Sequence, residues 1–333
     1  MRRRNLLFAP AVIFASCAVH AQATSKQHRI AFVHSAIAVD DLTEQHGPFW
    51  VRRLFAELRR LGYVEGENVV VQRYSGKGNP ALLPALSRDI VASNPDVIVA
   101  NFTLPVRAAL TAATSTIPIV AIMGDPITYG IVRSLARPGG NVTGVTIDAG
   151  ITVNGKRLQT LKQALPAVSR VAVITSRLEW GAAGGQQIQV AGEKLGIQAV
   201  GVFLDVASDD ELKRVFKEIS DQRVDAVVVS GSGDLLANRA AIVRLAHEHR
   251  IPAIYPYRDF VELGGLLAYA PDAGETGERL AQAVAQVLRG ANPGEVPIQQ
   301  ATKFKLIINV STAKALGLTI SPALLAQADE VIE

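Results

Sequence analysis

Short apolar segments alternate with longer amphipathic segments along most of the chain. The apolar segments are rich in Val, Ile and Ala, as strands buried on both faces of a sheet are. Parallel strands need long, usually helical connections, so the alternation predicts an α/β protein with parallel sheets. Gly62, Gly196 and Gly290 follow predicted helices, where glycine commonly ends a helix. The expected strands are 29–34, 68–74, 96–100, 117–122, 170–175, 198–204, 224–230, 251–255 and 265–270. The expected helices are 48–61, 79–93, 104–115, 152–164, 182–195, 209–222, 237–249 and 274–289.

Four sequence landmarks occur twice, in the same order. Any single pair is what two ordinary strands share, but four ordered pairs predict two lobes of like topology. We therefore expect an α/β fold of two doubly wound Rossmann-like lobes with a hinge and an inter-lobe cleft, because ligands bind beyond the carboxyl ends of such strands. Two tethered domains without a shared ligand are the alternative. The pairs are RIAFVHS (29–35) with RVAVITS (170–176), RLGYVEGENVVV (60–71) with KLGIQAVGVF (194–203), PDVIVAN (95–101) with VDAVVVSG (224–231), and IPIVAIMGDP (117–126) with IPAIYPYRDF (251–260).

Residues 1–23 have the pattern of a secretory signal peptide. Three arginines at positions 2–4 precede an apolar run over 6–17, and Ala21-Gln22-Ala23 has the small residues of a cleavage site. The run is shorter than the roughly 20 residues that span a bilayer. Phe14-Ala15-Ser16-Cys17 resembles a lipobox, so lipid anchoring at Cys17 is an alternative to simple release. The paired arginines also weakly resemble a twin-arginine signal.

Composition and charge exclude several classes of protein. The chain of 333 residues is 49% hydrophobic, which is too apolar for a disordered protein, and its length suggests two domains. A single cysteine excludes a disulfide scaffold. The formal net charge of +4 falls to +1 without the leader, which carries three arginines and no acidic residue. With no basic run interleaved with aromatic residues, we expect no nucleic-acid partner, and with no second long apolar stretch, no membrane span.

Known catalytic and cofactor motifs are absent from the sequence. It contains no P-loop, no G-x-G-x-x-G and no G-x-S-x-G elbow, so we expect no cofactor and no catalytic residue. His247 and His249 are spaced i, i+2 on a predicted helix and therefore point in different directions, so we expect no metal site. His34 ends the first predicted strand and is the one histidine expected at the cleft.

Small polar and aromatic residues gather at the predicted carboxyl ends of the strands. Hydroxyls and helix N-terminal N–H groups suit a carboxylate, Asp125 suits an ammonium group, and aromatic rings suit an apolar side chain. Each residue also has a local explanation as a helix cap, a turn residue or part of the core. As a group they favour a pocket for a small zwitterion over a catalytic site. The predicted ligand-binding residues are His34, Ser35, Asn101, Phe102, Thr103, Asp125, Pro126, Ser176, Trp180, Ser230, Ser232, Asp234 and Tyr257.

Three segments carry a family resemblance that covers essentially the whole chain after the leader. They are IPIVAIMGDPITYGIVRSLARPGGNVTGVT (117–146), IPAIYPYRDFVELGGLLAYAPD (251–272) and TKFKLIINVSTAKALGLTISPALLAQADEVIE (302–333). They resemble the ABC transporter substrate-binding protein family, which has a type I periplasmic-binding fold. The resemblance implies a non-enzymatic periplasmic protein that closes like a Venus flytrap on a small molecule. It also implies delivery of that molecule to an inner-membrane permease with its ATPase. Relatives of this group bind amino acids, including aromatic ones.

The sequence departs from the family's common pattern at positions expected to line the cleft. A more Phe-rich strand is usual near Ile122-Met123, and Ser is usual at Tyr257. Asn101-Phe102 and Ser176-Arg177-Leu178 are also uncommon residues for their loops. Ligand identity is therefore the property that transfers least from the resemblance.

The two-lobe plan implies approximate boundaries. We expect lobe 1 at 28–147 plus about 269–293 and lobe 2 at 148–268 plus about 294–333, with hinge crossings near 144–148, 264–269 and 291–298. We expect a monomer. Two other functions use the same cleft: a hydrolase with His34 as base, or a ligand-sensing module for a membrane signalling partner.

Overall fold

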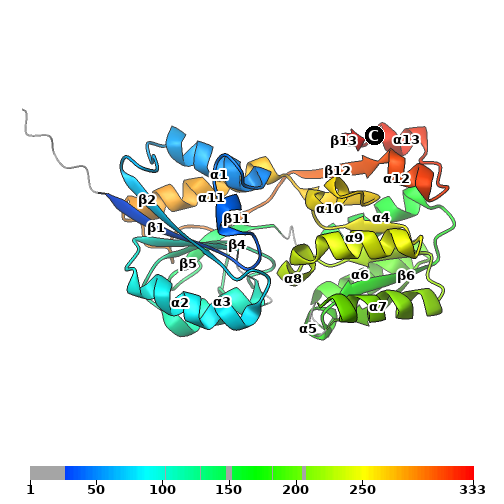
Figure 1. Ribbon diagram of the computed structural model, residues 1–333, viewed down its shortest axis with the longest axis horizontal. Helices are drawn as coiled ribbons and strands as arrows, with labels where there is room; N and C mark the ends of the chain where they lie inside the picture. Colours follow the sequence, from blue (N-terminus) through cyan, green and yellow to red (C-terminus); the bar gives the residue numbers. More distant parts are fainter. Residues whose placement is uncertain (1–26, 102, 128, 148–151, 182, 205–207) are drawn as a thin grey trace, which may run out of the picture.

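Two α/β lobes lie side by side in the molecule (Figure 1). The computed structural model describes residues 27–101, 103–127, 129–147, 152–181, 183–204 and 208–333. The predicted signal peptide, the possible lipid anchor at Cys17 and the candidate Phe102 lie outside the described residues. Each lobe contains a mainly parallel sheet with helices on both faces, which confirms the predicted α/β class.

The first lobe is built on a parallel sheet. Its strands are β1 (His28–His34), β2 (Val69–Ser75), β3 (Val97–Asn101), β4 (Ile119–Met123), β5 (Val142–Thr146) and β11 (Gln299–Gln300). Its helices are α1 (Phe49–Arg60), α2 (Leu83–Ala92), α3 (Leu104–Ala113) and α11 (Ala273–Leu288), with 3-10 turns at Val39–Asp41 and Pro80–Leu82. Among the described residues the strand order is β11-β5-β4-β3-β1-β2. Ile30 and Phe32 pack under α1 and α11, whereas Ala31 and Val33 pack under α2 and α3. Both faces of β1 are therefore buried, which explains its continuous apolar run.

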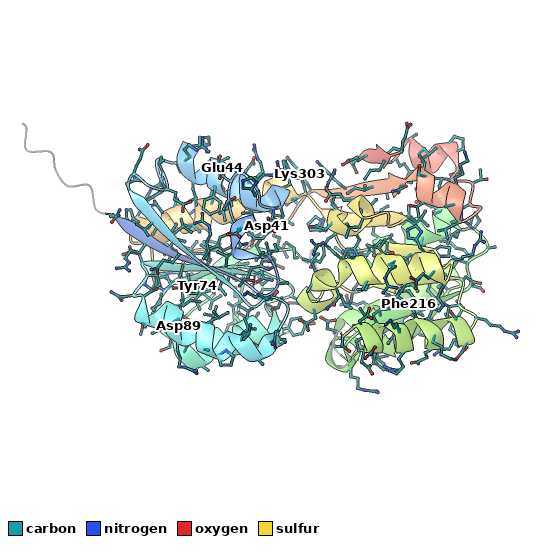
Figure 2. All side chains as sticks on the ribbon, in the orientation of Figure 1. Asp41, Glu44, Tyr74, Asp89, Phe216 and Lys303 are labelled. Atoms are coloured by element: carbon teal, nitrogen blue, oxygen red, sulfur yellow. The ribbon has the colours of Figure 1, made fainter. Side chains whose placement is uncertain are left out.

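The second lobe has a mixed sheet. Its strands are β6 (Arg170–Thr175), β7 (Gln198–Phe203), β8 (Ala226–Val229), β9 (Ala253–Tyr255), β10 (Leu267–Pro271), β12 (Phe304–Asn309) and β13 (Glu330–Ile332). Its helices are α4 (Thr152–Ala164), α5 (Arg177–Gly181), α6 (Ala183–Leu195), α7 (Asp209–Asp221), α8 (Gly233–Ala237), α9 (Arg239–Glu248), α10 (Arg258–Glu262), α12 (Val310–Ala315) and α13 (Pro322–Leu325). The strand order over the described residues is β13-β12-β10-β9-β8-β6-β7, and only the pairing of β10 with β12 is antiparallel. Phe216 on α7 is fully buried in the core of this lobe (Figure 2).

The two sheets share one core topology. Strands β2-β1-β3-β4-β5 in lobe 1 correspond in order and direction to β7-β6-β8-β9-β10 in lobe 2, and the four repeated landmarks are the corresponding strands β1 to β4 and β6 to β9. This confirms two doubly wound lobes of like topology. The sequence prediction missed four strands: β5, β11, β12 and β13. In β5, Gly144 and two threonines hide the strand pattern, yet Gly144 lies so close to the backbone of Ala121 that a Cβ has no room there.

The chain passes between the sheets after β5, after β10 and after β11. Strand β10 ends in the second sheet at Pro271, and β11 at 299–300 still pairs with β5 in the first sheet. The second and third passages therefore come several residues later than the expected hinges. The carboxylate of Glu275 joins these two passages, because it accepts hydrogen bonds from the N–H groups of Thr302 (3.1 Å) and Lys303 (2.9 Å). Over the described residues, no helix has both the length and the hydropathy to cross a membrane.

A candidate ligand site between the lobes

A cavity of about 410 Å³ is lined by residues of both lobes, at the carboxyl ends of β1, β3 and β4 on one side and of β6 and β8 on the other. Its volume lies in the range of small-molecule sites, and its position is where doubly wound sheets bind ligands. Ten predicted site residues line this cavity: His34, Asn101, Thr103, Asp125, Ser176, Trp180, Ser230, Ser232, Asp234 and Tyr257. Ser35 and Pro126 lie behind the wall.

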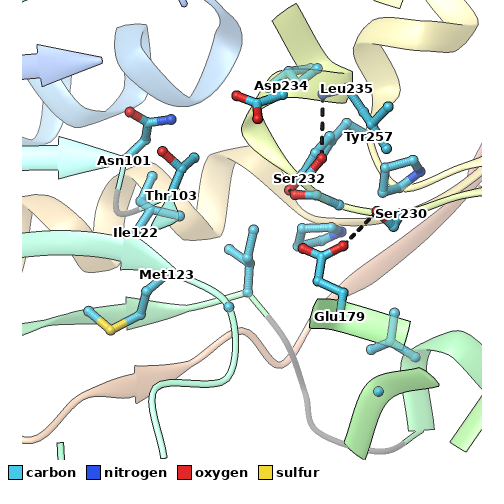
Figure 3. A pocket seen from close by; sticks show the side chains of 18 of the residues that line it. Asn101, Thr103, Ile122, Met123, Glu179, Ser230, Ser232, Asp234, Leu235 and Tyr257 are labelled. Carbon is cyan, nitrogen blue, oxygen red and sulfur yellow. Dashed lines mark hydrogen bonds between the residues drawn. The ribbon is translucent and has the colours of Figure 1, made fainter. Parts of the chain in front are cut away.

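Ser35 and Asn101 connect the ends of β1 and β3. The N–H of Ser35 donates to Asn101 Oδ1, and Asn101 Nδ2 donates to Ser35 Oγ, both at 2.9 Å. Ser35 therefore orients Asn101 and does not line the cavity itself. Next along the chain, Thr103 precedes α3 and lines the cavity (Figure 3), and among the described residues its buried Oγ1 has no hydrogen-bond partner.

His34 is held as a neutral ring at the end of β1. It is 2% exposed, and its Nδ1 accepts hydrogen bonds from the N–H groups of Ala36 (3.0 Å) and Ile37 (2.9 Å). Burial, and to a smaller extent the charge of Arg239, lowers the pKa of His34 to about 3. At neutral pH the ring proton therefore sits on Nε2, which is a donor. With Nδ1 occupied and Nε2 protonated, neither nitrogen is arranged to act as a base.

Two predicted site residues, Asp125 and Pro126, accept hydrogen bonds within the loop that follows β4. Oδ1 of Asp125 accepts the N–H of Ile127 at 3.0 Å, which is the turn role that Asp often has. The carbonyl of Pro126 accepts hydrogen bonds from Ile131 and Val132. Asp125 lines the cavity all the same, whereas Pro126 is buried beneath it.

In lobe 2 the predicted hydroxyls are largely engaged in local hydrogen bonds. Oγ of Ser176 accepts the N–H of Glu179 at 3.1 Å, and Oγ of Ser232 accepts the N–H of Leu235 at 3.4 Å. Both serines therefore cap short helices. The hydroxyl of Tyr257 donates to the carbonyl of Gly231 at 2.7 Å. These residues form the wall of the cavity more than they offer free donors to it.

Three charged side chains of lobe 2 retain unused binding capacity. Oε2 of Glu179 accepts hydrogen bonds from two hydroxyls, whereas its Oε1 has no partner among the described residues. Within that part of the chain Asp234 and Arg239 form no ion pair, and the guanidinium of Arg239 donates only to the carbonyl of Leu236 at 3.1 Å. Figure 3 shows the Asp234 carboxylate pointing toward the side of Asn101 and Thr103. Burial raises the pKa of Asp234.

Sequence reasoning missed Glu179 and Arg239. Arg239 begins an amphipathic helix, where a charge ordinarily faces solvent. Glu179 did have a usable signal, because the Ser-x-x-Glu spacing from Ser176 places it in the first turn of a helix directly after β6.

Apolar side chains make up much of the remaining wall. Trp50, Ile122 and Met123 contribute from lobe 1, and Trp180 and Ile188 from lobe 2. The ring of Trp180 also packs edge-on against Phe203 at 6.3 Å, so it serves both the core and the cavity. No cluster of three potential metal ligands occurs in the part of the chain that the structure describes.

Comparisons with known proteins agree with this geometry. The model of the family described as ABC transporter substrate binding protein matches residues 50–332. A tyrosine-binding protein of Clostridioides difficile is 26% identical over 267 residues, 78% of this chain and 74% of that protein. A solved structure of a conserved domain protein from Vibrio cholerae is 26% identical with a TM-score of 0.80, covering 92% of this chain and 100% of that chain. A Streptococcus pneumoniae ABC domain in complex with L-Trp has a TM-score of 0.81 at 23% identity, with the same coverage of both chains.

Proposed function

The chain belongs to the family of ABC transporter substrate-binding proteins with the type I periplasmic-binding fold, and on this premise we propose that it is the extracytoplasmic receptor of an amino-acid importer. The observation that carries the proposal is the cavity of about 410 Å³ between the lobes. It combines an apolar wall with a cation at Arg239 and an anion at Asp234. Complementary charges beside an apolar surface suit an amino acid better than a sugar or an inorganic ion.

The charged end of the ligand lies between Arg239, His34 and Asp234. The α-carboxylate accepts hydrogen bonds from the Arg239 guanidinium of lobe 2 and from the Nε2–H of His34 in lobe 1. Both residues line the same cavity. The α-ammonium group pairs with Asp234, whose partly desolvated carboxylate gains a counter-ion.

The side chain of the ligand is apolar and aromatic. Trp50, Trp180 and Ile188 offer flat and aliphatic surface against which a ring can pack. The tyrosine-binding relative and the L-Trp complex support an aromatic ligand for this chain as well.

Binding is coupled to closure of the lobes, and the bound amino acid is delivered to a membrane permease with its ATPase. The passages after β10 and β11 act with the one after β5 as the hinge. Ligand favours the closed state only by binding it better than the open state. Residues 1–23 direct the chain to the periplasm, where it works as a monomer and not as an enzyme. The Nδ1 of His34 already accepts two backbone hydrogen bonds, so it is not free to act as the base of a hydrolase.

A thermal-shift screen with the twenty amino acids tests the proposal. A ligand present at 100 times its Kd stabilises the folded protein by about 2.7 kcal/mol. We expect aromatic amino acids to raise the melting temperature and sugars to leave it unchanged. If folded protein responds to no amino acid, the proposal is wrong. A ligand that is converted during incubation, as seen by mass spectrometry, would instead favour the hydrolase.

A further inference from the structure

Glu179 presents a hydrogen-bond acceptor to the cavity that the protein itself does not use. Its carboxylate lies at the carboxyl ends of β6 and β8, where Oε2 accepts hydrogen bonds from the hydroxyls of Thr175 and Ser230, each at 3.0 Å. Figure 3 shows the bond from Ser230. Its Oε1 has no hydrogen-bond partner within the described part of the chain. No cation lies within ion-pair distance of the carboxylate among those same residues.

The position of this carboxylate is set from three directions. Oγ of Ser176 accepts the backbone N–H of Glu179 and so fixes the start of its helix. The two hydroxyls come from neighbouring strands and hold Oε2 between them. The orientation of the whole planar group follows, and Oε1 is left toward the ligand space. Such a preformed acceptor loses little side-chain entropy when a ligand donates to it.

The surroundings make an unused acceptor costly. Trp180, Ile188 and Leu204 line the same cavity in lobe 2. A carboxylate that loses water there on closure needs a donor, because an unsatisfied buried polar group costs free energy. Thr175 and Ser230 already donate their single hydroxyl hydrogens to Oε2. The remaining donor must therefore come from the ligand or from water.

We propose that Glu179 accepts a hydrogen bond from the polar hydrogen at the far end of an aromatic ligand side chain, so that the site selects a phenol or an indole over a phenyl ring. This inference rests on the proposed amino-acid function. In Figure 3, Glu179 lies away from Asp234, with Ser230 and Ser232 between them. Two separate carboxylates therefore contact the two ends of the ligand: Asp234 contacts the ammonium group and Glu179 contacts the ring.

The test is calorimetric titration of L-Trp, L-Tyr and L-Phe into wild type and Glu179→Gln. In wild type we expect L-Trp or L-Tyr to bind about 10- to 100-fold more tightly than L-Phe, as a hydrogen bond to a charged group allows. In the variant the amide oxygen keeps the two hydroxyl donors and the NH₂ faces the ligand. L-Trp, whose indole nitrogen only donates, then loses that advantage. L-Tyr loses less, because its hydroxyl can also accept. L-Phe is unchanged within about threefold.

Controls separate this inference from the function on which it rests. Glu193→Gln on α6 makes the same change of charge at an exposed position and should alter none of the three affinities. If Glu179→Gln weakens L-Trp, L-Tyr and L-Phe equally, Glu179 binds the ammonium group and the inference is wrong. If wild type binds L-Phe as tightly as the other two, the inference also fails, even if the variant does not fold. If wild type binds no amino acid, the proposed function is wrong, and the inference that rests on it is wrong as well.

Discussion

The two edges of the cavity differ in how their polar groups are used. In lobe 1, Ser35 and Asn101 satisfy each other, and both backbone N–H groups after His34 donate to its Nδ1. In lobe 2, Glu179, Asp234 and Arg239 keep acceptor or donor capacity that nothing in the described chain fills. The same strand topology therefore produces a lobe 1 edge whose polar groups are mostly paired locally, apart from Thr103 Oγ1, and a lobe 2 edge with three charged side chains that can still bind a ligand.

This difference suggests a division of labour between the lobes. We expect lobe 1 to contribute mainly the shape of the cavity, because Ser35, Asn101 and the Nδ1 of His34 are engaged in local hydrogen bonds. Lobe 2 contributes Glu179, Asp234 and Arg239, and we expect these charges to discriminate among ligands, whereas Asp125 of lobe 1 is engaged in its own loop. Removing a side chain that still has a hydrogen-bonding group available for ligand should change ligand affinity. Removing a side chain whose hydrogen bonds are all made within the protein should instead change the free energy of unfolding. The following predictions test that distinction, from the largest expected effect to the smallest.

Arg239→Gln should weaken an amino-acid ligand most. Removing one partner of a desolvated, hydrogen-bonded charge pair costs about 2–3 kcal/mol, or roughly 30- to 150-fold in Kd. Isothermal titration calorimetry measures this change. Arg244→Gln is the matched control, because Arg244 lies on the same helix but pairs with Glu248 and Asp209 outside the cavity. Equal effects of the two variants would show that Arg239 acts only through net charge.

Asp234→Asn and Asp125→Asn compare one carboxylate from each lobe. We expect the lobe 2 variant to raise Kd by about 10- to 100-fold, because it removes the charge opposite the ammonium group. The lobe 1 variant should raise it by about threefold or less, since Asn keeps the acceptor for the N–H of Ile127. Fluorescence or calorimetric titration gives both values. A larger effect at Asp125 would move the ammonium contact to lobe 1, as expected from the sequence alone.

His34→Asn should flatten the dependence of stability on pH in the ligand-free protein. The folded pKa of about 3 lies below the unfolded value of 6.5, so the unfolded chain binds the extra proton between these values. The free energy of unfolding therefore falls as pH drops below 6.5, by up to about 1.4 kcal/mol per pH unit from this group. Asn retains an acceptor for the two N–H groups. Urea unfolding at pH 7, 6, 5 and 4 measures the slope, and exposed His46→Asn should leave it as in wild type.

Ser35→Ala should lower the free energy of unfolding by about 1 kcal/mol and change ligand affinity by less than threefold, because its hydroxyl serves only Asn101. Ser230→Ala is the counterpart in lobe 2, where the lost hydroxyl holds Glu179, so its main effect should be on affinity. Urea unfolding and titration of both variants give the comparison. An affinity loss for Ser35→Ala larger than that for Ser230→Ala would contradict the division of labour.

The sequence by itself determined the lobes and most of their elements. The run from Ile30 to Val33 is apolar on both faces because helices cover both sides of the sheet, and Gly62 and Gly196 have the positive φ expected at helix ends. The ordered repeat predicted like topology, since each landmark is a strand with local hydrophobic patterning. Strand β5, with Gly144 and two threonines, lacks that patterning and was recognised only through its neighbours in the sheet. Strand β12 does have an apolar run, Leu306–Ile308, which the sequence prediction overlooked.

Only the tertiary structure decided which polar groups a ligand can use. Ten of the site residues predicted from the sequence do line the cavity, because the carboxyl ends of parallel strands meet at one edge of the sheet. It could not tell that Ser35 and Asn101 satisfy each other across 66 positions of sequence. Nor could it tell that Arg239, on an amphipathic helix, turns toward the cleft. Hydrophobic periodicity reports burial along one element, whereas unmet hydrogen-bonding capacity depends on partners that only folding brings together.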